Sequence, residues 1–309
     1  MFELQGSALM LPSDAPRGRA PQGGKVFFVH DLGDDSHEGN DPEYPLASIT
    51  AALLKCGVSK GDYIFVQHTA DSPYHSAINV NKGSVHLIGL GHGSYGPSNI
   101  IAGGQDAPAI TLGVNSGGVE IAGFNLGSGT EQDEPAIELD GDTWYVHIHH
   151  NGLGTAIRAL DGILIPAGMG FNFGSIDHNW FSRRLSGWGI KAGVPTATFT
   201  SSAILHNMFK MADGLGGVYL HGGEPEAVCF NTFGKKLGGD DGWAITLGGG
   251  GGYYCVDCMV MGNHAGETGD NTTGNNPYID RSASSTATLL NFWAANYKGE
   301  ALTAPATAT

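Results

Sequence analysis

The sequence predicts an all-β protein that folds as a single right-handed parallel β-helix with an N-terminal capping helix. Three observations predict this fold: a glycine-rich, charge-poor composition, a column of apolar residues that recurs about every 27 positions, and an asparagine column of similar period. Two columns that advance together indicate one structural unit repeated along the chain. A unit of this length holds three short strands and their turns, which is one coil of a solenoid.

The composition supports a folded β protein with many turns. Glycine contributes 50 of 309 residues, charged residues make up 15%, and hydrophobic residues make up 41%, which is enough to bury a core. Thirty acidic against fifteen basic side chains give a net charge of −15, which disfavours nucleic acid as a partner. No apolar run approaches the roughly 20 residues of a membrane-spanning helix, so no membrane partner is expected. No cofactor is expected either.

The chain divides into three parts. Residues 1–24 are rich in proline and glycine and predict an extended N-terminal arm. Within the next part, residues 45–57 have helical apolar spacing, with Ser48 as a candidate N-cap, and predict a helix that covers the exposed first coil. Residues 25–300 then form the β-helix domain, and residues 301–309 a flexible C-terminal tail.

The apolar column predicts one inward-facing strand position per coil, because nearly every member is followed two places on by another apolar residue. Its members are Ile110, Ile137, Ile163, Ile190, Val218 and Ile245. The asparagine column predicts a ladder in which each amide bonds to the asparagine one coil away, at a turn whose left-handed backbone asparagine tolerates. Its predicted members are Asn125, Asn151, Asn179, Asn207, Asn231, Asn263 and Asn291.

Histidines recur beside this ladder. His150, His178 and His206 each immediately precede a ladder asparagine, and His147 and His149 share one face of a strand. Imidazole is a common metal ligand, so a metal site is one hypothesis for this column. Stacked, half-exposed side chains are the alternative that we favour, and no metal site is predicted.

The four cysteines are too few for a disulfide scaffold at this length. Cys255 and Cys258 have a zinc-like spacing, but residues three apart on a strand point to opposite faces. We therefore expect the thiols to be free and to act as small core residues.

Acidic residues raise the possibility of sugar cleavage, which needs two carboxylates about 5–9.5 Å apart. Asp213 and Asp240 are separated by one period of the apolar column, so they are expected to stack on neighbouring coils. Asp241, Glu224 and Glu226 are the other candidate catalytic residues. The same acids also suit repeated turns, and this is the interpretation that we favour.

Aromatic residues are the candidates for a glycan or subunit contact. Neighbours in a strand cannot both face the core, so some aromatic side chains must lie on the surface. The candidates are Trp144, Tyr145, Trp188, Trp243, Tyr253 and Tyr254.

The segment from Val26 to Ile64 resembles the N-terminal signature of the pectin-lyase-like right-handed β-helix superfamily. It carries GDDS at 33–36, the helical pattern, and GDYI at 61–64, and the sequence at 85–94 resembles the next coil. The resemblance implies the fold but no single reaction, because the superfamily includes polysaccharide lyases, glycoside hydrolases, adhesins and phage proteins. The cation-poor coils and the lack of a secretory-signal pattern look most like the phage virion type, either capsid-decorating or tailspike-like.

We therefore expect a structural virion protein of a tailed phage, a homotrimer that decorates or cements the capsid or forms a short spike. The alternatives are a glycan-active enzyme (a depolymerase, hydrolase or lyase) and a non-catalytic, carbohydrate-binding adhesin. Whether the protein is an enzyme is left open, with the structural role favoured. The expected partners are further copies of the chain, capsid or other virion proteins, and surface polysaccharide, and the expected location is the virion.

Overall fold

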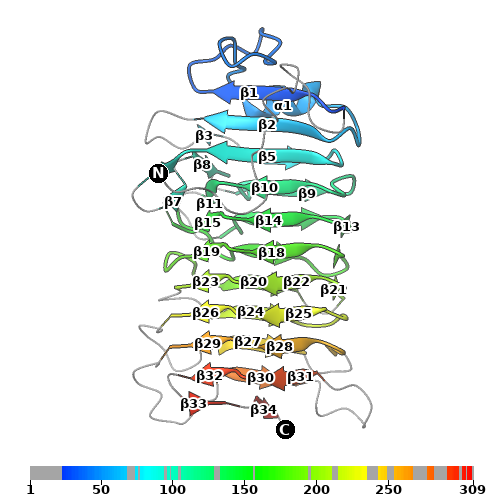
Figure 1. Ribbon diagram of the computed structural model, residues 1–309, viewed down its shortest axis with the longest axis vertical. Helices are drawn as coiled ribbons and strands as arrows, with labels where there is room; N and C mark the ends of the chain where they lie inside the picture. Colours follow the sequence, from blue (N-terminus) through cyan, green and yellow to red (C-terminus); the bar gives the residue numbers. More distant parts are fainter. Residues whose placement is uncertain are drawn as a thin grey trace.

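The structure is an all-β parallel β-helix whose coils stack along one axis, so the fold class predicted from the sequence is confirmed (Figure 1). No helix in the described ranges is long and apolar enough to cross a membrane. The computed structural model describes residues 23–67, 74–75, 77–93, 96–97, 99–103, 106–128, 133–155, 157–193, 196–210, 215–234, 243–248, 254–266, 277–281, 291–298, 301–303 and 305–307.

Sheet I carries the surface that concerns function, and its ten described strands all pair in parallel. In spatial order they are β1 (Val26–His30), β2 (Asp62–Gln67), β5 (Val85–Leu90), β10 (Glu120–Ala122), β14 (His147–His149), β18 (Ser175–Asp177), β22 (Ala203–Leu205), β25 (Ala227–Cys229), β28 (Met259–Met261) and β31 (Phe292–Ala294).

Sheets II and III complete each coil, with ten and nine strands in the described residues. Sheet II contains β3 (Tyr74–His75), β8 (Asn99–Ala102), β11 (Phe124–Gly127), β15 (Gly152–Leu153), β19 (Trp180–Phe181), β23 (Met208–Phe209), β26 (Thr232–Phe233), β29 (His264–Ala265), β32 (Tyr297–Lys298) and β33 (Ala301–Leu302). Sheet III contains β4 (Ile78–Val80), β9 (Ile110–Gly113), β12 (Ile137–Asp140), β16 (Ile163–Ile165), β20 (Trp188–Ala192), β24 (Gly216–Leu220), β27 (Trp243–Leu247), β30 (Tyr278–Asp280) and β34 (Ala306–Thr307).

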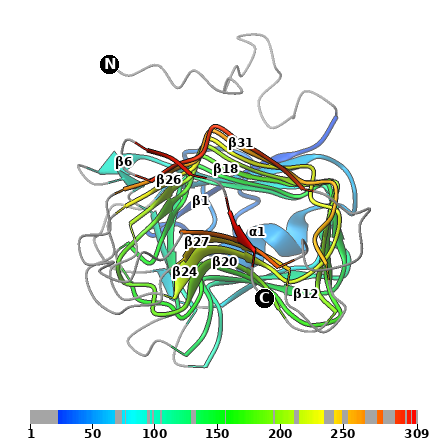
Figure 2. The same cartoon turned by 90° about the horizontal axis from the view of Figure 1, so that it is seen from below.

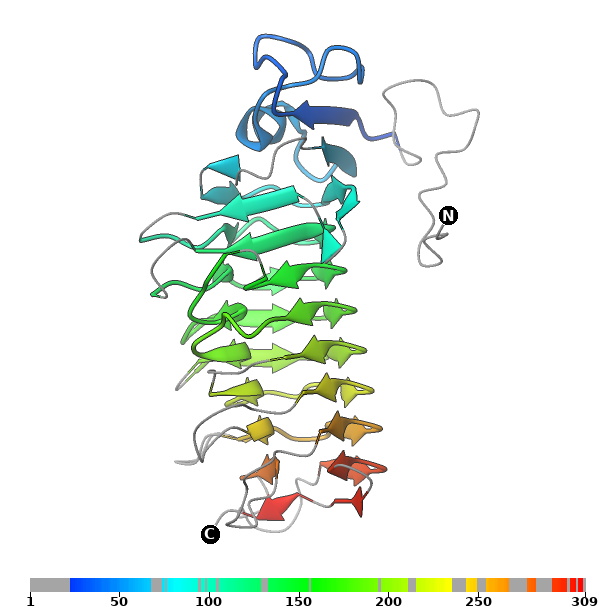
Figure 3. The same ribbon diagram turned by 90° about the vertical axis from the view of Figure 1, so that its left-hand side faces the viewer.

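Two small sheets lie outside these three. One pairs corner strands in parallel, and the other is a two-stranded antiparallel ribbon. They contain β13 (Thr143–Trp144), β17 (Gly170–Asn172) and β21 (Thr198–Thr200), and β6 (His92–Gly93) and β7 (Gly96–Pro97). In side view the coils form a straight column (Figure 3).

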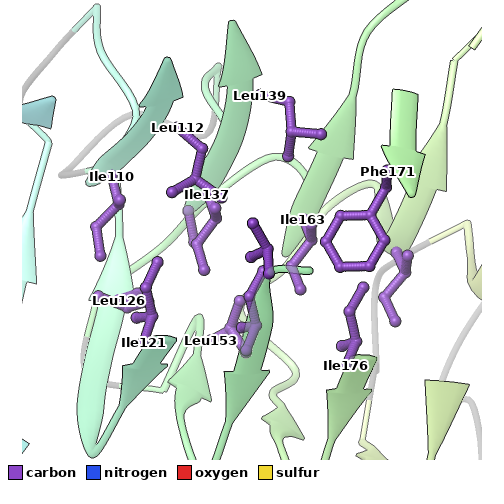
Figure 4. Close-up of a cluster of buried hydrophobic side chains, with 14 of the residues drawn as sticks. Ile110, Leu112, Ile121, Leu126, Ile137, Leu139, Leu153, Ile163, Phe171 and Ile176 are labelled. Carbon is purple, nitrogen blue, oxygen red and sulfur yellow. The ribbon is translucent and has the colours of Figure 1, made fainter. Parts of the chain in front are cut away.

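The core is built from apolar columns that run along the axis. The predicted column is confirmed in sheet III, where Ile110 pairs with Ile137 and Ile137 with Ile163, and all three are fully buried (Figure 4). Sheet I contributes a second column, in which Ile121, Ile148 and Ile176 occupy successive strands. Identical residues stacked at strand spacing fill the interior without gaps, which is why a column of near-constant period specifies this fold.

The capping helix is present as α1 (Ile49–Lys55). The Ser48 hydroxyl accepts a hydrogen bond from the Ala51 amide at 3.1 Å, as an N-cap does. Ile49 and Leu53 are buried, and viewed along the axis the helix lies across the end of the interior (Figure 2). The helix therefore covers apolar surface that the first coil would otherwise expose.

Within residues 301–309, the predicted flexible tail, β33 pairs with β32 and β34 pairs with β30. The predicted boundary between the β-helix domain and this tail stays a prediction. The predicted N-terminal arm, residues 1–24, lies outside the described residues except for 23 and 24.

Candidate functional site on the outer face of sheet I

An asparagine ladder fixes the turn between sheets I and II. Asn179 receives a bond from the Asn151 side-chain amide at 3.2 Å, and its own amide donates to Asn207 at 3.1 Å. The same pattern continues through Asn231 and Asn263. Each amide also donates to a backbone carbonyl of sheet I, as Asn179 does to Ile148 at 2.8 Å. The ladder thus pairs buried backbone groups that water cannot reach.

Two predicted members do not belong to this ladder. Asn125 is shifted by one position, because Phe124 stands where the register requires an asparagine, and the Asn151 side chain accepts from the Phe124 amide. At the other end the ladder position is Asn296, which accepts from the Asn263 side chain at 2.9 Å. Asn291 instead accepts from the Cys258 backbone amide. The error at Asn291 arises because the coil from Asn263 to Asn296 is longer than the period of the column.

The left-handed backbone expected at the asparagines lies one residue earlier. His150, His178 and His206 each have a φ of 54°, and Phe230 has a φ of 57°. Their rings stack in a row on the outside of the corner, with centroids 5.1 Å apart from His150 to His178 and from His178 to His206. The predicted histidine column therefore exists.

A carboxylate on strand β10 joins two histidines on the outer face of sheet I. The ring of His86 donates from Nδ1 to Glu120 Oε2 at 2.6 Å, and His149 donates from Nε2 to Glu120 Oε1 at 2.7 Å. His149 also contacts His150, with their Nδ1 atoms 2.8 Å apart. Both oxygens of Glu120 are thus held by imidazoles from the two neighbouring strands, and strand pairing sets this arrangement.

A second carboxylate repeats the arrangement two strands further on, on β18. His147 donates from Nε2 to Asp177 Oδ1 at 2.7 Å, and His178 donates from Nδ1 to Asp177 Oδ2 at 2.9 Å. The His147 and His149 rings stack with centroids 3.9 Å apart, which joins the two halves of the network. We call Glu120, His147, His149 and Asp177, with the histidines bonded to them, the polar half of sheet I.

Both carboxyls are held ionised. Burial raises the pKa of Glu120, but hydrogen bonds from His149 and His86 outweigh it and place the pKa below its usual range. Burial likewise raises the pKa of Asp177, and the bonds from His147 and His178 outweigh it in the same direction. One ligand atom from each of Glu120, His147 and His149 lies within 4.8 Å of the others, so these residues could hold a metal ion.

Exposed aromatic rings gather at the opposite corner of sheet I. Phe173 stacks against both Trp144 and Tyr145, with centroids 5.8 and 5.5 Å apart. Tyr145 is 65% exposed and Phe173 46% exposed. Two of the predicted contact residues, Trp144 and Tyr145, therefore form one surface together with Phe173, which the sequence analysis did not select. We call these three rings the aromatic platform.

The other predicted contact aromatics lie elsewhere. Trp188 is only 7% exposed, so it does not offer the surface contact that was predicted. Gly216 on the next strand leaves space for its indole to lie flat, and Tyr219 stacks on it at 5.1 Å. Trp243 is half-buried on β27 and Tyr254 is half-buried on a turn, while Tyr253 lies outside the described residues.

The predicted catalytic acids are not brought together in the described part of the chain. Glu224 and Glu226 are exposed on the turn between β24 and β25. Asp213, Asp240 and Asp241 lie outside the described residues, so the expected stacking of Asp213 on Asp240 stays a prediction.

The outer face of sheet I becomes apolar beyond β18. Its outward columns on β22, β25, β28 and β31 carry no charged side chain, and Phe292 is 60% exposed. We call this surface the apolar half of sheet I. Its residues are Ala203, Leu205, Ala227, Cys229, Met259, Met261, Phe292 and Ala294.

Sequence reasoning missed the acids that organise the histidines. Glu120 lies one coil before His147, and Asp177 lies one coil after His149, so the coil period itself places each acid beside a histidine. Extending the period from the histidines to every polar residue on the same strands could have identified both pairs.

Searches of protein-family models and of curated proteins return no match. Among solved structures, a rhamnogalacturonan lyase aligns with a TM-score of 0.36 and 13% identity, over 78% of this chain and 82% of that chain. The GH136 lacto-N-biosidase from Eubacterium ramulus aligns with a TM-score of 0.34 and 11% identity, over 79% of this chain and 56% of that chain. Both scores are below 0.5, so the function is argued from the geometry of this chain.

Proposed function

We propose that this protein is a non-catalytic, glycan-binding β-helix that serves as a surface component of a phage particle. The observation that carries the glycan-binding part is the aromatic platform, in which Trp144, Tyr145 and Phe173 present stacked, exposed rings at one corner of sheet I. The outer face of the same sheet carries the ionised carboxylates. Sugar rings stack on aromatic faces, and their hydroxyls bond to carboxylates and imidazoles.

Backbone strain supports a role for these rings beyond folding. Tyr145 and Phe173 have φ values of 59° and 54°, where a bulky residue is uncommon. The same column adopts this conformation with the small residues Ser84, Gly118 and Ser201, so the turn needs a left-handed residue but not an aromatic one. Glycine adopts this conformation without the roughly 1–2 kcal/mol that an L side chain adds. Strained residues that the fold does not require tend to occur at functional sites.

The state of the two carboxyls on sheet I favours binding over cleavage at this surface. Glycosidases need one carboxylic acid whose pKa is raised so that it can protonate the leaving group. The pKa values of Glu120 and Asp177 are lowered, because histidines donate to them. These groups suit hydrogen bonding to hydroxyls. A depolymerase that uses the predicted acids Asp213, Asp240, Asp241, Glu224 and Glu226 is the alternative, and release of reducing ends would reveal it.

Substitution of the strained rings by glycine tests the platform. The probes are purified bacterial surface polysaccharides and oligosaccharides made from them, with affinity measured by isothermal titration calorimetry. Tyr145→Gly and Phe173→Gly should each weaken binding at least tenfold while leaving the melting temperature unchanged or raised, because glycine relieves the strain.

The matched control is Phe230→Gly, at the other corner of sheet I. Phe230 has the same left-handed backbone, with a φ of 57°, and is 47% exposed. It should bind glycan as the unmodified protein does. Undiminished binding by a protein that lacks all three platform rings would overturn the proposal.

A specific observation also favours self-association. The apolar half of sheet I carries no charged side chain and includes the exposed Met259 and Phe292, on a chain of net charge −15, so it is where two copies can approach without repulsion. We propose that it faces the axis of a homotrimer, and that this trimer decorates or cements a capsid or forms a short spike. The cation-poor coils, which resemble those of phage virion proteins, support the virion assignment.

Sedimentation equilibrium at micromolar concentration tests the trimer, for which a mass three times that of the single chain is expected. A stable monomer would contradict it. Co-purification with phage particles tests the virion location, and a protein absent from washed particles would contradict it.

A further inference from the structure

We propose that Glu120, His147 and His149 form a binding site for a divalent transition metal of the zinc class on the outer face of sheet I. This site is separate from the aromatic platform, and the metal proposal does not depend on the proposed glycan binding. It also goes beyond the sequence analysis, which favoured stacked histidines without a metal.

Strand pairing delivers the three ligands to one place. Glu120 on β10 lies directly beside His147 on β14, and His149 points to the same side two residues on. Their candidate ligand atoms all lie within 4.8 Å of one another. Zinc bonds nitrogen and carboxylate oxygen at about 2.0–2.2 Å, so two of its ligands lie at most about 4.3 Å apart. The three ligand atoms therefore need to approach one another only slightly to close around the ion.

The surrounding groups match what metal sites require around their ligands. Histidines that bind a metal usually donate their other ring N–H to a carboxylate, which fixes the tautomer. His147 does this to Asp177 at 2.7 Å through Nε2, which directs its Nδ1 to the metal. His86 holds the second oxygen of Glu120 at 2.6 Å, which leaves Oε1 as the ligand.

The contact between His149 and Glu120 marks the metal position. His149 Nε2 and Glu120 Oε1 are 2.7 Å apart and share a proton. A divalent cation between these two atoms takes the place of that proton, which passes to His149 Nδ1 and is then donated to His150 Nδ1, 2.8 Å away, with the proton of His150 on its Nε2. The His149 ring therefore stays neutral and its proton is retained.

The ligand chemistry selects the metal class. Two imidazoles and one carboxylate favour zinc, cobalt, nickel or copper, whereas calcium and magnesium prefer all-oxygen ligands. The side chain of His147 is 36% exposed, so the remaining coordination positions open to solvent. A three-ligand site with open positions is the arrangement that metals use when they also bind an external oxygen ligand.

The fold itself does not need these side chains. The column that holds Glu120 and His147 continues as Ser175, Ala203 and Ala227 on the following strands. Small uncharged residues thus occupy the same positions on other strands of the same sheet. Two carboxylates and several imidazoles gathered on β5, β10, β14 and β18 and the adjoining turns indicate selection for a ligand rather than for folding.

Titration of the full chain, first stripped with a chelator, tests the site. Zn²⁺ is titrated by calorimetry and Co²⁺ by visible absorption, whose intense bands report tetrahedral nitrogen and oxygen ligands. We expect one ion per chain with micromolar or tighter affinity, and affinity that falls as the pH is lowered, because the ligands must lose their protons.

Variants locate the ion. His149→Ala, His147→Gln and Glu120→Gln should each weaken binding at least tenfold, and Asp177→Asn should weaken it by about 10–100-fold through the His147 tautomer. His206→Ala, from the same histidine column but away from the cluster, is the matched control and should bind normally. Circular dichroism confirms that each variant is folded, and His147→Gln keeps a polar side chain at an exposed position. Absence of one-to-one binding, or equal affinity in the ligand variants and the control, would overturn the proposal.

Discussion

The two halves of sheet I share one interior and differ on the outside. Beneath the polar half the inward column is Ile148 and Ile176, and beneath the apolar half it continues as Ile204 and Val228, all fully buried. Above them, the outward residues change from histidines and carboxylates to methionine, alanine and phenylalanine. The comparison teaches that the inward columns and the asparagine ladder define the coil, whereas the outward columns are free to carry function.

The largest expected effect concerns the shared interior. Ile148→Ala and Ile204→Ala should each lower the free energy of unfolding by about 2–5 kcal/mol, because both leave a cavity in the same packed column. Denaturant unfolding of the two variants measures the loss of unfolding free energy. A clearly smaller loss for one of them would mean that the outer surface contributes to the packing below it.

The second largest effect concerns the asparagine ladder, which lies at the turn beside both halves of sheet I. Asn179→Ala should lower the free energy of unfolding by about 1–3 kcal/mol, since the Asn151 amide and the Ile148 carbonyl lose their partner. Thermal and denaturant unfolding measure the change.

Asn125→Ala is the matched control for the ladder. Asn125 lies on strand β11, one residue past the ladder position, and it bonds to the Thr155 hydroxyl at a half-buried position. Its substitution should cost less than about 1 kcal/mol. Equal losses for the two variants would show that ladder membership adds no stability.

The sequence predicted the interior of this protein better than its surface. The recurrence of Ile110, Ile137 and Ile163 identified the coil, because inward positions must all satisfy the same packing. Ser48 and the pattern after it located the capping helix. The ladder was misplaced at Asn125 and Asn291, where a one-residue shift and a longer coil break the period.

The candidate site was only partly predictable, for a physical reason. His147 and His149 were recognised as sharing a face, but their carboxylate partners stand a whole coil away along the chain, and only strand register joins them. Phe173 joins Trp144 and Tyr145 through the same register. Outward residues obey no common packing rule from coil to coil, so their groupings follow from the register and not from composition.

A smaller effect is expected at the apolar half. Met259→Ser with Phe292→Ser should raise the dissociation constant of the proposed trimer at least tenfold, about 1.4 kcal/mol, because apolar contact area is lost. Sedimentation velocity measures the change. The stability of the single chain should stay within about 0.5 kcal/mol, since both side chains are exposed.

Leu32→Ser is the matched control for the apolar half. Leu32 is exposed on the loop after β1, away from this surface, and its substitution should leave the oligomer intact. Dissociation by the control to the same extent would argue against a defined interface on sheet I.

The smallest effect concerns the thiols in and below the apolar half. Cys229, Cys255 and Cys258 are buried thiols in the single chain. Burial raises the pKa of Cys255 from its usual 9.0 to about 12, so its thiolate is scarce at pH 8. Labelling by a thiol reagent at pH 8 should therefore be slow in the native protein and complete in denaturant. The rate should be the same in the Met259→Ser, Phe292→Ser variant, because the sheet itself covers these sulfurs. Burial also makes the stability depend on pH, because the folded protein holds the Cys255 proton more tightly than the unfolded chain does. The contribution of this thiol to the free energy of unfolding is fully present below about pH 8.5 and is lost as the pH rises toward 12. Rapid labelling of the dissociated variant alone would show instead that a partner chain, and not the coil, protects the apolar half.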